Sequence, residues 1–306
     1  MIYTSIKQGF SQTWANKRMI LLFYLASLVF GVIIVWPLRS ILSGFIGNSM
    51  MGADLAGRMN MDFLFEFFKN VSSAPNAFFG LVFLIPAIYW LFGLFLSGGA
   101  LASFARGEKY EPAFFWGSSA KYFGRFLRLV LWSLPVLAIL LALQFLESGA
   151  QRLFFGSDPY QNITYWGGWI RFGMRYFALI LFMVIFDYAR IYTVLNDEKK
   201  MYVSLREALK FALANFGRTF GLAFLLALIG ITVLTIYNPI ANLLSAPNGF
   251  VILILFFVQQ AYMLFRMILK LTAFSGQMHL YRGIAEQETE VAIEPDDDVG
   301  LAGAAV

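Results

Sequence analysis

Long runs of apolar residues, separated by short polar segments, dominate the chain between residues 19 and 275. A membrane-spanning helix needs roughly 20 mostly apolar residues, because the hydrocarbon layer is about 30 Å thick and a helix rises about 1.5 Å per residue. The pattern therefore predicts an all-α polytopic membrane protein. Its six predicted spans are residues 19–38, 77–104, 126–146, 172–195, 220–237 and 250–275.

A short amphipathic segment that ends in arginine precedes each odd-numbered span. These segments are residues 10–18, 116–125 and 209–218, and the second and third both end in Phe-Gly-Arg. Their apolar residues recur at helical spacing, which places one apolar stripe against the headgroup boundary and the cations toward anionic lipid. We expect three interfacial helices, each leading into a helical hairpin.

The residues at the far ends of the first and fifth predicted spans also resemble each other. Residues 37–44 (Pro-Leu-Arg-Ser-Ile-Leu-Ser-Gly) resemble residues 239–246 (Pro-Ile-Ala-Asn-Leu-Leu-Ser-Ala), whereas the middle segment has Pro135 inside its span. One interpretation is a triplicated unit of interfacial helix, span, loop and span, arranged as parallel repeats. The other is that any six-span protein has basic flanks and interfacial aromatics. We favour the triplication.

Composition supports the membrane interpretation. Hydrophobic residues make up 59% of the 306 residues and charged residues only 13%, about half the share in ordinary soluble domains. A soluble two-domain enzyme is therefore excluded. With the N-terminus inside, 17 of the 23 Lys and Arg residues lie in cytoplasmic segments or at adjoining helix ends. The positive-inside bias then predicts that both termini are cytoplasmic. The apolar run of the first span is too long for a signal-peptide core and is followed by no small-residue cleavage pattern, so we expect a retained anchor.

The end of the chain differs from the rest. Seven of the eighteen acids lie between Glu286 and Asp298, so the remaining chain carries a formal charge of +12. A segment rich in acids and small residues buries too little apolar surface to fold, so we predict that residues 284–306 form a disordered acidic cytoplasmic tail. We favour a solubilising end over a docking strip for a basic partner.

Ionisable groups inside a span are costly and mark functional hypotheses. Asp187 is the one acid well inside a predicted span, and Arg190 follows at i+3 on the same helical face. Arg266 and Lys270 share one face of the last span. These groups could line a cytoplasm-facing vestibule for an anionic solute or lipid headgroup. The alternative, which we favour, is that Asp187 neutralises one of the cations and pins the fourth helix to the sixth.

Two further polar or small-residue features lie inside predicted spans. Gln259 and Gln260 are in the middle of the last span, where amides commonly hydrogen-bond to a neighbouring helix; a substrate contact is the other interpretation. Residues 97–100 (Ser-Gly-Gly-Ala) form a small-residue surface on the second span, and we expect it to serve close helix packing.

Catalytic chemistry has little support in the sequence. Cysteine is absent and His279 is the single histidine, whereas a zinc site needs about three protein ligands of suitable type. No metalloprotease, serine-hydrolase or nucleotide-binding motif is present. We therefore expect no enzymatic activity, no cofactor, no metal and no nucleic-acid partner.

The amphipathic segments, the Phe-Gly-Arg pairs and the hairpin arrangement resemble several uncharacterised bacterial families of six-span inner-membrane proteins. The resemblance covers most of residues 1–283 and implies a multi-pass protein of the bacterial inner membrane, without an assigned activity. Two functions remain open: a non-enzymatic scaffold or accessory component, or a transporter of a small anionic solute or lipid. The expected partners are the bilayer with its anionic inner leaflet and either a membrane protein or a second copy of the chain.

Overall fold

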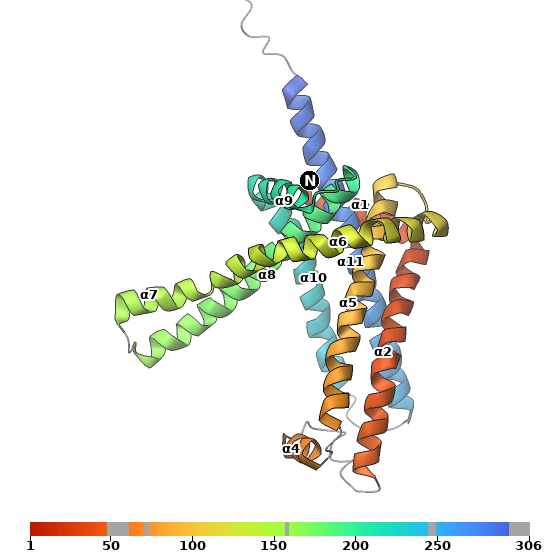
Figure 1. Ribbon diagram of the computed structural model, residues 1–306, viewed down its shortest axis with the longest axis vertical. Helices are drawn as coiled ribbons and strands as arrows, with labels where there is room; N and C mark the ends of the chain where they lie inside the picture. Colours follow the sequence, from red (N-terminus) through yellow and green to blue (C-terminus); the bar gives the residue numbers. More distant parts are fainter. Residues whose placement is uncertain (48–60, 71–73, 157–158, 244–248, 294–306) are drawn as a thin grey trace, which may run out of the picture. The chain divides into compact units, whose positions relative to one another are not determined.

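A computed structural model describes residues 1–47, 61–70, 74–156, 159–243 and 249–293. Every regular element in these residues is a helix (Figure 1). The helices are α1 (Ile2–Ala15), α2 (Lys17–Ile46), α4 (Met61–Asn70), α5 (Ala74–Arg106), α6 (Pro112–Ala142), α7 (Phe145–Phe155), α8 (Gln161–Leu195), α9 (Met201–Ala214), α10 (Phe216–Leu243) and α11 (Gly249–Ile293).

Six helical stretches among the described residues are long and apolar enough to cross a membrane, which confirms the predicted all-α polytopic fold. Large apolar side chains on them are exposed, such as Trp36 at 76% and Leu131 at 62%. So much exposed apolar surface suits lipid and not water. The six stretches are Lys17–Ile46, Gly80–Arg106, Pro112–Phe155, Gln161–Leu195, Phe216–Pro239 and Gly249–Gln287.

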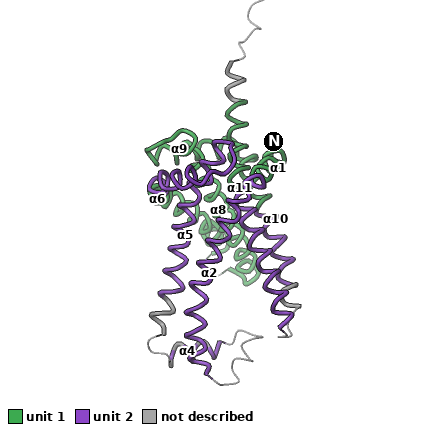
Figure 2. The backbone as a smooth tube through the Cα atoms, turned by 90° about the vertical axis from the view of Figure 1, so that its right-hand side faces the viewer, with its two compact units in different colours: residues 1–12, 128–226, 272–306 green, residues 13–127, 227–271 purple. Residues whose placement is uncertain are grey.

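The chain divides into two compact units, neither of which is continuous in sequence (Figure 2). Unit 1 consists of residues 1–12, 128–226 and 272–306, and unit 2 of residues 13–127 and 227–271. Each unit has its own packed interior.

In unit 2, α2 packs against α5, and α5 also approaches the first part of α6 very closely. A methyl group added at Gly99 would lie 2.7 Å from the backbone oxygen of Phe115, and one at Gly98 would lie 3.1 Å from Cβ of Tyr122. Only glycine permits this separation. The prediction that residues 97–100 serve close helix packing is confirmed.

In unit 1, α8 packs against α9 and α7 packs back along the first half of α8. Tyr188 of α8 is fully buried, with its ring centroid 5.1 Å from that of Phe211 on α9 and 6.4 Å from that of Tyr281 on α11. The same unit contains a close crossing of α1 and α11 at Gly9 and Gly276, where a Cβ on Gly9 would lie 2.7 Å from the backbone nitrogen of Gly276.

The amphipathic segments before the first and third odd spans are separate helices, and both breaks fall at asparagine. Asn16 separates α1 from α2 with φ −107° and ψ 48°, and Asn215 ends α9 with φ −111° and ψ 33°. Asparagine favours such breaks because its helix propensity is low, and the Asn16 side-chain oxygen accepts a hydrogen bond of 2.7 Å from the backbone nitrogen of Tyr110. The middle segment, residues 116–125, has no asparagine and continues without a break into its span as α6.

Helix α11 continues to Ile293, well beyond the predicted end of the last span. Residues 284–293 are therefore helical, and their assignment to a disordered tail is wrong; residues 294–306 lie outside the described residues. Buried apolar side chains support α11 as far as residue 284, because Phe274, Met278 and Ile284 are each at most 5% exposed. Packing of these side chains stabilises the first turns beyond the predicted end of the span.

Candidate functional site

The charged residues predicted on α8 form a compact cluster in unit 1. Arg190 donates through Nη2 to Oδ1 of Asp187, one helical turn away. The second carboxylate oxygen of Asp187, Oδ2, accepts a hydrogen bond of 3.1 Å from Nε2 of Gln277 on α11. Both oxygens of the carboxylate are therefore engaged, one within α8 and one across to α11.

Two aromatic rings hold the Arg190 side chain. Its guanidinium carbon lies 4.9 Å from the ring centroids of both Phe186, one turn earlier on α8, and Phe274 on α11. The Arg190 side chain is only 9% exposed. A cation held against ring faces and away from water gains up to about 2 kcal/mol from such contacts, so the guanidinium is fixed by charge, hydrogen bonding and aromatic packing together.

Three buried polar atoms in this cluster have no hydrogen-bond partner among the described residues. They are the hydroxyl of Tyr188, Nε of Arg190 and Oε1 of Gln277. Each buried, unpaired polar atom costs about 1–3 kcal/mol. The cluster is thus more polar than its ion pair requires, and the remainder of the fold has to offset that cost.

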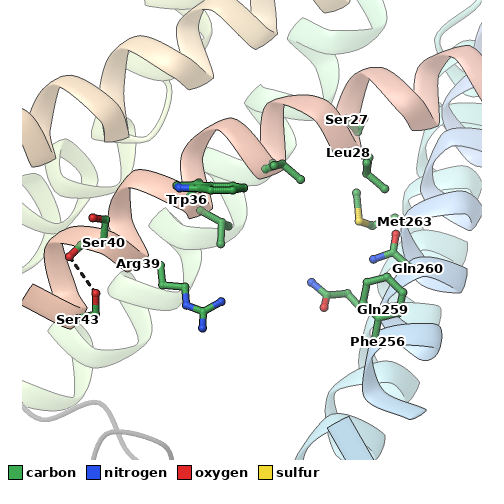
Figure 3. A pocket seen from close by; sticks show the side chains of 13 residues that line it. Ser27, Leu28, Trp36, Arg39, Ser40, Ser43, Phe256, Gln259, Gln260 and Met263 are labelled. Carbon is green, nitrogen blue, oxygen red and sulfur yellow. Dashed lines mark hydrogen bonds between the residues drawn. The ribbon is translucent and has the colours of Figure 1, made fainter. Parts of the chain in front are cut away.

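The other predicted intramembrane residues belong to unit 2. The side-chain oxygen of Gln260, Oε1, accepts a hydrogen bond of 2.7 Å from the Tyr24 hydroxyl, so this glutamine links α11 to α2. Gln259 and Gln260 also line a cavity of about 800 Å³ between these two helices (Figure 3). The expected bond from a mid-span amide to a neighbouring helix is found for Gln260, and Gln259 faces the cavity.

Arg266 and Lys270 contact aromatic rings in unit 2. The guanidinium of Arg266 lies 6.0 Å from the ring centroid of Tyr262, and Nζ of Lys270 lies 5.4 Å from that of Phe23. Asp187 and Arg190 belong to unit 1. Within unit 1 the side chain that links Asp187 to α11 is Gln277, an uncharged residue that the sequence did not single out.

A second, half-buried ion pair, between α7 and α8, was missed. Glu147, whose side chain is 4% exposed, accepts from Nε and Nη2 of Arg171 at 3.0 and 2.8 Å. On either side, Arg175 donates to Gln144 at 2.9 Å and Gln151 donates to a backbone oxygen of α8 at 3.1 Å. We call this series of contacts the hairpin ladder.

Glu147, Gln151 and Arg171 of the hairpin ladder lie between the third and fourth predicted spans, and Gln144 and Arg175 lie at the adjoining ends of those spans. The spacing of these residues could have predicted the contacts. Glu147 and Gln151 are four residues apart, as are Arg171 and Arg175. Residues four apart share one face of a helix. Two such polar faces in antiparallel neighbours can pair along their length.

Among the described residues, no group of three or more His, Cys, Asp or Glu side chains is placed to hold a metal ion. Comparison with known proteins finds no matching family model, no matching curated protein and no matching solved structure. The resemblance to bacterial six-span families therefore stays a prediction, and function has to be inferred from the geometry.

Proposed function

We propose that this protein is a non-enzymatic integral component of the bacterial inner membrane, acting as a scaffold or accessory subunit. The supporting observation is the state of Asp187, the acid placed well inside a span. Its two oxygens are engaged by Arg190 and Gln277. A transport or catalytic acid has to exchange its proton or bind substrate, whereas this carboxylate is used to hold α8 and α11.

The proposed topology has both termini in the cytoplasm. The six stretches of the described residues that are long and apolar enough to cross a membrane are even in number, which supports placing both termini on the same side. The excess of Lys and Arg that accompanies the two termini supports assignment of that side to the cytoplasm.

We also propose that the chain contains three hairpin repeats. The nearly identical backbone angles at Asn16 and Asn215 support a common origin for the first and third repeats. The Phe-Gly-Arg sequence at residues 123–125, shared with residues 216–218, supports the inclusion of the second repeat.

The alternative function is transport of a small anionic solute or lipid. The cavity between α2 and α11 favours it, because this is a space of ligand size with Arg39 on its wall. Its polar groups differ from the charged residues of the fourth and sixth spans on which the sequence-based hypothesis depended.

Substitution at the ion pair tests its structural role. Asp187→Asn leaves Arg190 buried without a counter-charge, which should lower the free energy of unfolding by about 3–5 kcal/mol. Adding Arg190→Gln should restore part of the loss. The matched control is Glu207→Gln in α9, which breaks an exposed i,i+3 pair with Lys210 and should cost no more than about 0.5 kcal/mol. If Asp187→Asn is as mild as the control, the pair does not hold the fold.

Water access separates scaffold from transporter. The chain has no cysteine, so Gln277→Cys introduces a single thiol beside Asp187 and keeps the ion pair. A membrane-impermeant thiol reagent should leave this variant unlabelled in native membranes, while it labels Tyr202→Cys, an exposed control on α9. Equal labelling of both thiols would establish a water route to Asp187 and favour transport.

A further inference from the structure

The cavity between α2 and α11 has apolar walls along most of its length. Leu28, Val32 and Val35 line it from α2, and Phe256 and Met263 line it from α11. Its volume of about 800 Å³ is within the range of small-molecule sites. Walls of this kind require an apolar occupant, because burying a polar molecule there would leave its hydrogen bonds unmade.

One end of the cavity contains polar groups that already bind each other. The Tyr24 hydroxyl donates to Gln260 at 2.7 Å, and the hydroxyls of Ser27 and Tyr89 lie 2.8 Å apart. These bonds join α2 to α11 and α2 to α5. This end therefore does not call for a polar group on the occupant.

The other end carries a cation. Arg39 lines the cavity, and its side chain extends from α2 into the space that faces Gln259 (Figure 3). Among the described residues, Arg39 has no ion-pair or hydrogen-bond partner. Ser40 and Ser43 add hydroxyl groups beside it, and Trp36 lies one turn away. An arginine fork with hydroxyls nearby suits a phosphate group, and tryptophan is typical of the headgroup level.

The distance from the Ser27 end of the cavity to Arg39 matches one leaflet of a bilayer. The lining residues of α2 run from Ser27 to Ser43, and Arg39 lies twelve residues beyond Ser27, which corresponds to about 18 Å along a helix. Half of the hydrocarbon thickness is about 15 Å. An acyl chain that starts at the headgroup level near Arg39 would therefore end close to Ser27.

We propose that this cavity binds an anionic phospholipid of the surrounding bilayer, with one acyl chain between α2 and α11 and the phosphate on Arg39. This proposal says only what occupies the cavity, and it does not depend on the proposed scaffold function. Loss of the lipid would leave the Asp187 pair intact, and loss of that pair leaves the groups of the cavity unchanged.

Lipid retention by the purified full-length protein tests the charge at the site. Protein extracted from vesicles of equal phosphatidylglycerol and phosphatidylcholine content should retain phosphatidylglycerol preferentially, as measured by mass spectrometry of the bound lipid. Arg39→Gln should lower that preference about tenfold, since a charge-assisted hydrogen bond is lost. Arg18→Gln, a matched exposed cation on α2 outside the cavity, should leave it unchanged. Equal retention by the two arginine variants would overturn the proposal.

Filling the space tests the acyl chain. Gly31 lines the cavity, and a Cβ there would meet no atom within 4 Å, so Gly31→Phe should fold and occupy the acyl position. Gly44→Phe is the control, since position 44 is equally open but is not part of the lining. We expect lipid loss from Gly31→Phe alone. Undiminished retention in that variant overturns the proposal, as does displacement of the lipid by soluble glycerol phosphate, which would indicate a site for small anions.

Discussion

The crossing of α1 and α11 at Gly9 offers a sharp test of the packing in unit 1. A Cβ on Gly9 would lie 2.7 and 2.8 Å from the backbone nitrogen and Cα of Gly276, and 3.0 Å from the backbone oxygen of Thr272. Ordinary contacts of carbon atoms are about 3.5–4.0 Å. Since all three atoms are backbone, no rotation of a side chain can relieve Gly9→Ala, and the two helices would have to separate by about 1 Å.

That separation would also stretch the polar contacts of α1. Ser275 and His279 of α11 both contact Oε1 of Gln12, at 2.5 and 3.0 Å. An increase of about 1 Å would bring the Ser275 contact to the limit of hydrogen-bond length and take the His279 contact beyond it. Overpacking costs about 1–3 kcal/mol, and alanine in place of a helical glycine returns up to about 1 kcal/mol. We expect Gly9→Ala to destabilise the protein by about 1–2 kcal/mol.

Two further alanine variants calibrate this estimate. A Cβ on Gly276 would meet its nearest atom, the backbone oxygen of Ser5, at 3.3 Å, so Gly276→Ala should be close to neutral. Gly173 in α8 has no atom within 4 Å of its Cβ position, so Gly173→Ala should be stabilising by about 0.5–1 kcal/mol.

Equilibrium unfolding in mixed detergent micelles, followed by far-ultraviolet circular dichroism, measures the three variants on one scale. The expected order of stability is Gly173→Ala, then Gly276→Ala, then Gly9→Ala. If Gly9→Ala is as stable as Gly173→Ala, α1 does not cross α11 at these glycines and the account of unit 1 fails.

Two more substitutions address other contacts. Gly99→Ala places a methyl group 2.7 Å from the backbone oxygen of Phe115 and should destabilise the protein by about 1–2 kcal/mol; an unchanged unfolding midpoint would contradict the close α5–α6 packing. Arg171→Gln removes the counter-charge of Glu147 and should cost about 1–3 kcal/mol in the same assay. Adding Glu147→Gln should recover part of it, and failure to recover any would show that the two side chains do not act as a pair.

The hydrophobic pattern was sufficient for the fold class because a bilayer imposes a length and a composition on each span. The hydrophobic pattern was less informative where a helix extends beyond the apolar residues of its span. Helix α8 begins at Gln161 and not at residue 172, and α11 continues to Ile293. The first half of α8 is stabilised by packing against α7, and α11 has buried apolar side chains as far as Ile284. A window of average hydrophobicity does not detect such packing.

Among the polar and charged residues, a contact within one helix was predicted and two contacts between helices were missed. The i+3 spacing of Asp187 and Arg190 was enough to predict their pairing, because one helix determines it. Gln277 and Glu147 were missed because their partners are distant in sequence or lie on another helix. Such pairings depend on how helices approach each other, and that approach is set in part by glycines such as Gly9 and Gly276, which the sequence did not single out.

The hairpin ladder has a consequence for how the protein is made. Glu147 leaves the ribosome 24 residues before Arg171, which at about 5–20 residues per second is a delay of roughly 1–5 s. During that interval the Glu147 carboxylate lacks the arginine that engages it in the folded protein. The contact between α7 and α8 therefore forms only after both limbs of the hairpin have been synthesised.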